Sequence, residues 1–252
     1  MSAERKDNLD MKYMGSKSRI VSDIAPIIQA AVDASEKHLY YEPFCGGCNV
    51  IDHIRANDRY AADKQKYLIA LYQNLHLLAE LPDAISKEHY AEVREDYNNR
   101  AGKFPDWYIG AIGFLASYNG RFFDGGYAGT VYTKAGTVRD YYSEAKRNLE
   151  AQVPRLQGIH FGCQEYIDTK PLKGWVIYCD PPYQGTKQYG VSKDFDYLTF
   201  WEWVRKFSRE NAVFVSEHHA PDDFTCVWEQ PVIRTIDNAK RVPVVERLFT
   251  KG

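Results

Sequence analysis

The stretch that decides the fold is Leu39–Cys48 (LYYEPFCGGC), in which an apolar strand pattern leads directly into a Gly-Gly turn. Residues 49–56 then have a helical pattern, and Tyr60–Ala62 gives a short second strand that ends on Asp63. A second helix is predicted over Lys66–Leu78, where leucines recur at helical spacing. The order strand, helix, strand, helix is typical of a parallel sheet with crossover connections.

The same alternation returns in the second half of the chain after an interruption. Apolar patterns predict three more strands, over 159–163, 175–179 and 212–216, and a helix over 198–209 before the last of them. The runs 227–233 and 244–250 are expected to form a closing antiparallel pair. In the interruption Pro, Gly and Asn break the pattern, and Trp107–Tyr142 holds ten aromatic residues in thirty-six. We therefore expect an α/β domain built from residues 1–79 and 156–252, with a mostly helical insertion over 80–155.

Composition excludes several classes of protein. The 252 residues include 32 Lys and Arg against 34 Asp and Glu, a net charge of −2, so any nucleic-acid contact must come from a local patch. The sequence contains no run of about 18 apolar residues, so no membrane span is expected. The polar start MSAERKDNLD has no apolar segment, so no secretory signal is expected. Five cysteines, an odd number, favour a reducing cytoplasm over a disulfide scaffold. We expect a cytoplasmic monomer.

The sharpest local signal is Asp180-Pro181-Pro182-Tyr183, directly after the apolar run 175–179. Ligands of open α/β sheets bind outside the carboxyl ends of strands, which is where this tetrapeptide is expected. Two prolines fix φ and remove two N–H donors, so the loop presents a carboxylate, a rigid carbonyl and a ring. These groups suit gripping a flat amine by its edge and its face. A plain strand-ending turn is the alternative.

This motif and several other segments resemble those of the Dam-like DNA adenine N6-methyltransferases, the group with a DPPY motif. The resemblance extends over nearly the whole chain. The elements, in the family's order, are Lys12-Tyr13-Met14-Gly15-Ser16-Lys17, Glu42-Pro43-Phe44-Cys45-Gly46-Gly47, Ala62-Asp63, Phe161–Tyr166 (with Glu165 replacing the family's Asp), Asp180-Pro181-Pro182-Tyr183, Tyr189-Gly190, Phe195-Asp196 and Val245–Leu248. The resemblance implies a Rossmann-like sheet with helices on both faces and a target-recognition insertion. It also implies S-adenosyl-L-methionine (AdoMet) as methyl donor, no metal, and double-stranded DNA as partner in a bacterial or phage-infected cell.

Several of these elements are expected to contact AdoMet, through Tyr13, Lys17, Phe44, Gly46, Asp63, Glu165, Tyr166 and Asp180. Gly46 lets backbone approach a ligand closely. Asp63 lies 17 residues beyond Gly46, close to the spacing at which an acidic residue grips ribose hydroxyls, although a helix N-cap is an alternative role. The resemblance assigns Lys17 to the cofactor's carboxylate, with a solvated lysine as the alternative, and Glu165 to its adenine amine.

The expected catalytic residues are Asp180, Pro181, Pro182 and Tyr183. An adenine inside a duplex cannot be reached, so the base must flip out. Asp180 and the Pro181 carbonyl would then hold its N6 amine, while Tyr183 stacks on the base. Stacking needs a ring and not a hydroxyl.

The insertion is the expected target-recognition region. Ser117–Phe123 (SYNGRFF) resembles the family's segment before the specificity region, and residues 117–139 are locally basic. The expected DNA contacts are Asn119, Arg121, Lys134 and Arg139. An ordinary aromatic-rich core is the alternative for any one of them.

The segment Cys45-Gly46-Gly47-Cys48 leaves a redox protein as an alternative function, because C-x-x-C between a strand and a helix is typical of thioredoxin-like redox sites. Zinc would need a second ligand pair, which the sequence does not offer at the usual spacing. Packing of two small residues beside Phe44 is the preferred interpretation. RNA or another amine is the alternative substrate, since DPPY grips an amine rather than DNA as such.

Overall fold

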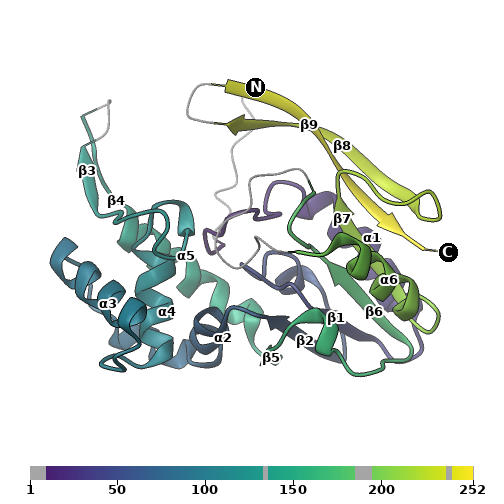
Figure 1. Cartoon of the computed structure of the whole chain (residues 1–252), viewed down its shortest axis with the longest axis horizontal. Helices are drawn as coiled ribbons and strands as arrows, with labels where there is room; N and C mark the ends of the chain where they lie inside the picture. Colours follow the sequence, from purple (N-terminus) through teal and green to yellow (C-terminus); the bar gives the residue numbers. More distant parts are fainter. Residues whose placement is uncertain (1–9, 133–135, 185–194, 237–239, 252) are drawn as a thin grey trace. The chain divides into compact units, whose positions relative to one another are not determined.

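A computed structural model describes residues 10–132, 136–184, 195–236 and 240–251 (Figure 1). Contacts divide the chain into two compact units. The first unit consists of Met1–Val21, Gly46–His53 and Gln65–Cys163, and the second consists of Ser22–Cys45, Ile54–Lys64 and Gln164–Gly252. The predicted insertion over 80–155 lies inside the first unit, and its boundaries stay a prediction.

A seven-stranded mixed sheet has the order β5-β2-β1-β6-β7-β9-β8. Its strands are β1 (Leu39–Glu42), β2 (Asp58–Asp63), β5 (Ile159–Cys163), β6 (Trp175–Cys179), β7 (Ala212–Glu217), β8 (Thr225–Ile236) and β9 (Lys240–Thr250). β1 pairs in parallel with β2 and β6, and β6 pairs in parallel with β7. β9 is antiparallel to both β7 and β8. This order confirms the predicted Rossmann-like α/β sheet with an antiparallel pair at one edge.

Helices surround these strands and fill the first unit. The α-helices are α1 (Val21–Ala34), α2 (Lys66–Gln73), α3 (Lys87–Asn99), α4 (Asp106–Leu115), α5 (Tyr141–Leu156) and α6 (Tyr197–Phe207), and the 3-10 helices are η1 (Ile51–His53), η2 (Leu75–Glu80), η3 (Tyr118–Gly120) and η4 (Tyr166–Asp168). None of the helices in the described ranges has the length and apolar character needed to cross a membrane.

The core of the second unit lies on both faces of its central strands. Ile177 and Cys179 of β6 pack in one cluster with Trp203 of α6. Val176 and Tyr178, at the alternate positions of the strand, are buried on the opposite face. Figure 1 shows α6 on the near side of these strands and α1 on the far side. Helices therefore cover both faces, as predicted.

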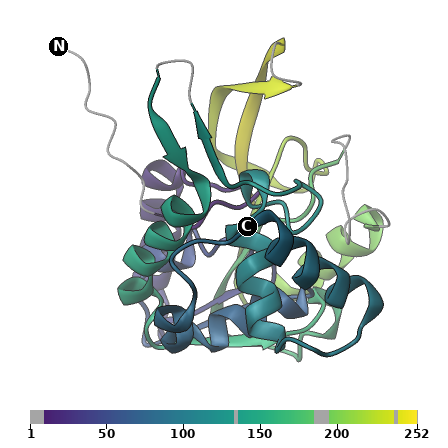
Figure 2. The same ribbon diagram turned by 90° about the vertical axis from the view of Figure 1, so that its left-hand side faces the viewer.

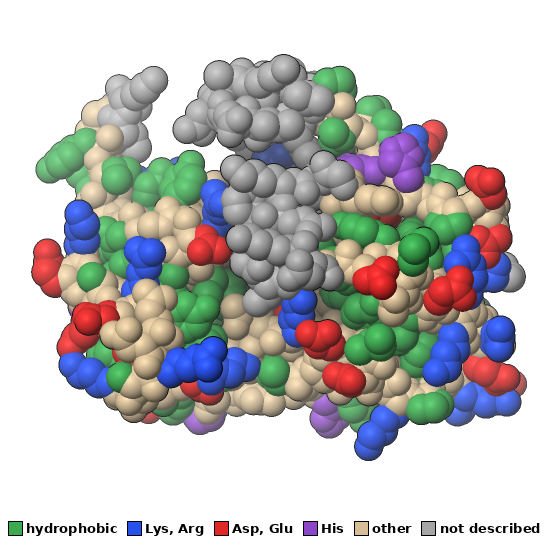
Figure 3. Space-filling model, viewed as in Figure 1, with side chains coloured by type: hydrophobic (Ala, Val, Ile, Leu, Met, Phe, Trp, Pro, Cys, Tyr) green, Lys and Arg blue, Asp and Glu red, His purple; other side chains and the backbone are tan. Residues whose placement is uncertain are grey.

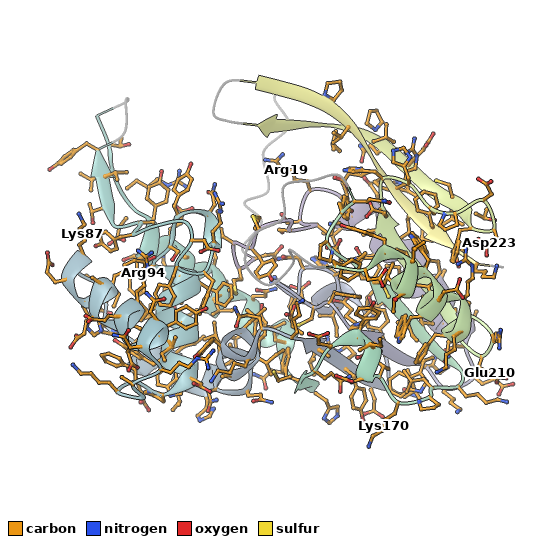
Figure 4. The ribbon with its side chains drawn as sticks, in the orientation of Figure 1. Arg19, Lys87, Arg94, Lys170, Glu210 and Asp223 are labelled. Atoms are coloured by element: carbon orange, nitrogen blue, oxygen red, sulfur yellow. The ribbon has the colours of Figure 1, made fainter. Side chains whose placement is uncertain are left out.

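An ion-pair cluster fastens the end of the chain to α6 in the second unit. The carboxylate of Asp223, labelled in Figure 4, accepts hydrogen bonds from Arg205 of α6 at 2.8 Å and from Lys251 at 2.7 Å. These two cations hold the pKa of the Asp223 carboxyl well below its ordinary value, Arg205 most strongly.

The first unit is mostly helical, as predicted for the insertion, with one exception among the described residues of 80–155. Its helices α2 and α4 lie so close that a Cβ on Gly110 would be 2.1 Å from the Tyr67 carbonyl oxygen. The exception is an antiparallel hairpin of β3 (Thr130–Tyr132) and β4 (Val138–Asp140). Figure 2 shows this hairpin standing away from α5. The sequence analysis did not predict it.

Two predicted helices differ from the structure. Of residues 49–56, only Ile51–His53 form a helical turn, and the left-handed Cys48 (φ 57°) bends the chain just before it. The predicted helix Lys66–Leu78 is interrupted at Asn74 (φ −123°) and continues as a 3-10 helix. The side chain of Asn74 donates to the Ala70 carbonyl at 2.8 Å, which ends the α-helix locally.

Candidate active site

The sheet topology places a switch point at the carboxyl ends of β1 and β6. These strands are neighbours, and the chain runs outward from β1 to β2 on one side and from β6 to β7 on the other. Open α/β sheets bind ligands at such a switch point. Phe44 follows β1 and Asp180 follows β6. The structure thus brings these two predicted residues to one edge of the sheet.

Backbone hydrogen bonds join the loops of the second unit at this edge. The Cys45 N–H donates to the Ala62 carbonyl at 2.9 Å, and the Gln164 N–H donates to the Asp63 carbonyl at 3.2 Å. Asp63 is the last residue of β2, so its carboxylate stands at the sheet edge, as predicted. The loops after β1 and β2, and the start of the segment that carries Glu165, are therefore fixed to one another.

An aromatic cluster lies in the same unit. The Phe44 and Tyr166 rings are 5.2 Å apart, and Phe195 lies within 5.9 Å of Phe44 and 5.7 Å of Tyr166. Asp63 is half-buried, whereas Glu165 is exposed. A unit that holds both these rings and a half-buried carboxylate fits an adenosine group, whose base needs apolar contact and whose ribose needs acceptors. The donor set of this unit therefore fits AdoMet.

The motif Asp180-Pro181-Pro182-Tyr183 is held from the C-terminal strands of the second unit. Tyr183 is only 6% exposed, and its hydroxyl donates to Glu246 Oε2 at 2.9 Å. Its ring meets the His218 ring edge-on at 4.7 Å between centroids. The next residue, Gln184, donates its N–H to Glu217 Oε2 at 2.9 Å. Sequence reasoning missed these contacts of Glu217, His218 and Glu246.

Burial and nearby carboxylates keep the Tyr183 hydroxyl and the Cys179 thiol protonated. Burial raises the pKa of the Tyr183 hydroxyl well above its ordinary value, and Asp180 and Glu246 add to the effect. Burial likewise raises the pKa of the Cys179 thiol, with Glu42 and Asp180 contributing. The Tyr183 hydroxyl is therefore a hydrogen-bond donor at neutral pH.

The N-terminal motif and the glycines of the first unit pack on each other. A Cβ on Gly46 (φ 44°) would lie 2.8 Å from the Tyr13 ring, and the Tyr72 hydroxyl donates to the Gly46 carbonyl at 2.9 Å. Lys17 is 6% exposed, and its Nζ donates to the Gly15 carbonyl at 3.1 Å. The glycine at position 46 is thus required for the approach of Tyr13. The predicted contact of Gly46 with the cofactor stays a prediction.

The described members of the predicted DNA contacts belong to the first unit and differ in exposure and in ion pairing. Asn119 is exposed in a left-handed conformation (φ 56°), and Arg121 is half-buried. Arg139 donates twice to Glu144, at 2.7 and 2.8 Å, and Lys12 pairs with the same carboxylate. Lys134 lies outside the described residues. Arg139 must therefore exchange a partner to reach a phosphate.

Exposed apolar side chains of the hairpin are a feature that sequence reasoning missed. Tyr132 is 83% exposed, Val138 60% and Val131 39%. Figure 3 shows hydrophobic side chains gathered over the hairpin. Three such residues on a two-stranded ribbon bury little against their own unit, so they are suited to contact a partner.

The thiols of Cys45 and Cys48 are both buried, at 4% and 0% exposure. Reactive cysteines need an accessible, electropositive surrounding. Their burial favours the packing interpretation over a redox site.

The sheet order and the DPPY loop at its switch point are together typical of Rossmann-like amino-methyltransferases. A model of the family described as D12 class N6 adenine-specific DNA methyltransferase matches residues 13–208, most of the chain. The chain belongs to this family.

Curated relatives include bacterial DNA adenine methylases. The chain is 26% identical to that of Salmonella typhi over 203 residues, 71% of this chain and 66% of the relative. The Salmonella typhimurium (strain LT2) relative gives the same values. The retron Ec67 DNA adenine methylase of Escherichia coli is 27% identical over 201 residues, 70% of this chain and 64% of the relative. The matched part thus spans slightly under two thirds of each relative.

Among solved structures, the chain is similar to a Haemophilus influenzae protein provisionally described as a methylase. The identity is 10%, the TM-score is 0.35, and the match covers 92% of this chain and 88% of that one. A score of this size bears neither on the fold nor on the function.

Proposed function

We propose that the protein is a site-specific methyltransferase that moves a methyl group from AdoMet to the N6 amine of adenine in double-stranded DNA. The observation that carries this proposal is Asp180-Pro181-Pro182-Tyr183 at the end of β6, at the switch point of the sheet, in a member of the D12 class. The sulfonium of AdoMet supplies a methyl group that is already activated.

The residues of the motif have the task of holding and aligning the amine. The lone pair of the N6 amine is delocalised into the adenine ring, so the free amine is a poor nucleophile. The Asp180 carboxylate and the Pro181 carbonyl accept its two hydrogens and favour a geometry in which the lone pair is available. Alignment of two reactants can lower a barrier by about 7–11 kcal/mol in favourable cases. Pro182 keeps the loop rigid, and Tyr183 supplies a ring for the flipped base.

The cofactor contacts in the second unit follow from the chemistry of the residues there. Asp63 would accept hydrogen bonds from the ribose hydroxyls, and Phe44 with Tyr166 would provide apolar contact for the adenine. Glu165, exposed in the structure, would accept from the adenine amine. In the first unit Tyr13, Lys17 and Gly46 remain proposed contacts on the strength of the motif alone.

Target recognition is assigned to the first unit. We propose that the hairpin contacts the duplex through Tyr132, while Asn119, Arg121 and Arg139 add polar and phosphate contacts. Lys134, between the two hairpin strands in sequence, belongs to the same proposal. Support comes from the 83% exposure of Tyr132 and from the position of the hairpin between the Asn119 turn and α5 in the chain.

We further propose that the protein works as a monomer in the cytoplasm of a bacterial or phage-infected cell. The bacterial and retron origins of the curated relatives support this setting. Size-exclusion chromatography with light scattering should give the mass of one chain, 29.1 kDa. A stable dimer would contradict the monomer.

A cellular experiment tests the proposed function. The chain is expressed in bacteria that lack adenine methylation, and their DNA is sequenced by a method that detects N6-methyladenine. We expect methylated adenine within one short recurring sequence, and none when Asp180→Ala is expressed at the same level. N4-methylcytosine in the DNA, or methylation confined to RNA, would contradict the proposal.

A further inference from the structure

Tyr183 is anchored by its hydroxyl, a group that the stacking role does not use. The hydroxyl donates to Glu246 Oε2 at 2.9 Å, and the Tyr183 and Glu246 side chains are 6% and 5% exposed. A hydrogen bond to a charged acceptor in so dry a place is among the stronger ones in proteins. It fixes the far end of the ring, while the motif backbone fixes the near end.

Strand β9, which carries Glu246, also binds the His218 side chain, whose ring contacts Tyr183. The His218 ring lies edge-on to the Tyr183 ring, at 4.7 Å between centroids. Its Nδ1 is 2.9 Å from the Val245 carbonyl, which can only accept, so Nδ1 carries the proton and donates. β9 thus reaches Tyr183 directly through Glu246 and indirectly through Val245 and His218.

A second buried carboxylate secures the backbone after the motif. Glu217 is 2% exposed, its Oε2 accepts the Gln184 N–H at 2.9 Å, and its Oε1 accepts the His218 N–H at 2.6 Å. Gln184 directly follows Tyr183. The end of β7 therefore holds the loop at the position where the prolines no longer constrain it.

We infer that Glu246 is a positioning residue for methyl transfer, which acts through the Tyr183 hydroxyl and sets the orientation of the ring that meets the flipped base. The inference rests on the proposed function. It changes one expectation from the sequence, because the hydroxyl of Tyr183 then matters as well as its ring. It also makes the C-terminal strand β9 part of the active site, although β9 contributes no group to the reacting atoms.

The test compares Tyr183→Phe, Glu246→Ala, Glu246→Gln and the double variant Tyr183→Phe/Glu246→Ala. Glu210→Gln is the matched control, because Glu210 is an exposed carboxylate of the second unit that pairs with Lys173, away from β9 and His218. For each protein kcat, KM for DNA, AdoMet affinity and the thermal midpoint are measured. The fluorescence of 2-aminopurine at the target position reports base flipping separately from chemistry.

Tyr183→Phe and Glu246→Ala should each lower kcat about tenfold or more, the size of one charged hydrogen bond, with AdoMet affinity changed less than about twofold. The double variant should be no slower than the slower single variant, because both changes remove the same contact. Glu246→Gln keeps an acceptor oxygen and should recover most of the rate. Glu210→Gln should behave as wild type. If Glu246→Ala fails to fold, Tyr183→Phe, which removes one oxygen, decides.

Wild-type kcat in Tyr183→Phe would overturn the inference, as would single losses that multiply in the double variant. If Glu246→Ala lowers only the thermal midpoint and leaves kcat unchanged at low temperature, the role of Glu246 is purely structural. That result would also overturn the inference. A wild-type protein that methylates no adenine would instead refute the proposed function, and this inference with it.

Discussion

Among single residues, the proposed role of Asp63 in AdoMet binding can be tested separately from DNA binding. Asp63 ends β2 at the sheet edge and is half-buried. Asp63→Ala should weaken AdoMet binding by about 1.5–3 kcal/mol, because a ribose diol would lose a charged acceptor. DNA affinity should stay within about twofold of wild type. Isothermal titration with AdoMet and fluorescence anisotropy with duplex DNA measure the two affinities.

Asp58→Ala is the control for this change, since Asp58 begins the same strand and is exposed. It should leave both affinities unchanged. An equal loss of AdoMet affinity in both variants, or an equal loss of both ligands in Asp63→Ala, would contradict the assigned role.

Among the elements, the hairpin β3–β4 is the part of the first unit that we propose contacts DNA. Tyr132→Ala should weaken binding to duplex DNA by about 1–3 kcal/mol if its ring stacks against the nucleic acid, with AdoMet affinity unchanged. Val227→Ala removes an exposed apolar group from β8 and should have no effect. Unchanged DNA affinity in Tyr132→Ala would remove the hairpin from the proposed interface.

The carboxylate of Glu144 links α5 to the end of the hairpin and to the N-terminal motif. Arg139 and then Lys12 lower the pKa of the Glu144 carboxyl to about 2. A lowered pKa in the folded protein means that the stabilisation is present above the ordinary pKa of 4.5 and is lost as the pH falls toward 2. Glu144→Gln should therefore lower the free energy of unfolding by about 0.2–1 kcal/mol at pH 7.

Urea titrations at a series of pH values measure this difference. The curves of wild type and Glu144→Gln should converge between pH 5 and about 2. Glu150→Gln, an exposed position on the same helix, should show no such convergence. A difference that grows as the pH falls would contradict the assigned ion pairs.

How far the sequence predicts the structure depends on whether the deciding contacts are local. The apolar runs before Phe44 and Asp180 identify the central strands, because strands buried on both faces are continuously apolar. The hairpin was missed because its strands are three residues each and their side chains are exposed, so no burial pattern marks them. Glu246 belongs to the closing-strand element Val245–Leu248, but its contact with Tyr183 was missed because the two residues are 63 positions apart and no local spacing connects them.

At the scale of the whole molecule, the two units carry different parts of the proposed function. The second unit holds the DPPY motif, Asp63 and Glu246 of β9, and the first unit holds the proposed DNA contacts and the N-terminal motif. The net charge of −2 gives no general attraction to DNA. In the proposed function, contacts of the first unit supply the attraction to DNA.

The central claim is that this chain methylates adenine in duplex DNA at its DPPY site. Purified protein is incubated in EDTA with duplex DNA and AdoMet labelled in the methyl group, and the DNA is digested to nucleosides. We expect label in N6-methyladenine for wild type and a loss of rate by orders of magnitude for a folded Asp180→Ala variant. Label found only in cytosine or only on RNA, or an Asp180→Ala variant as active as wild type, would contradict it.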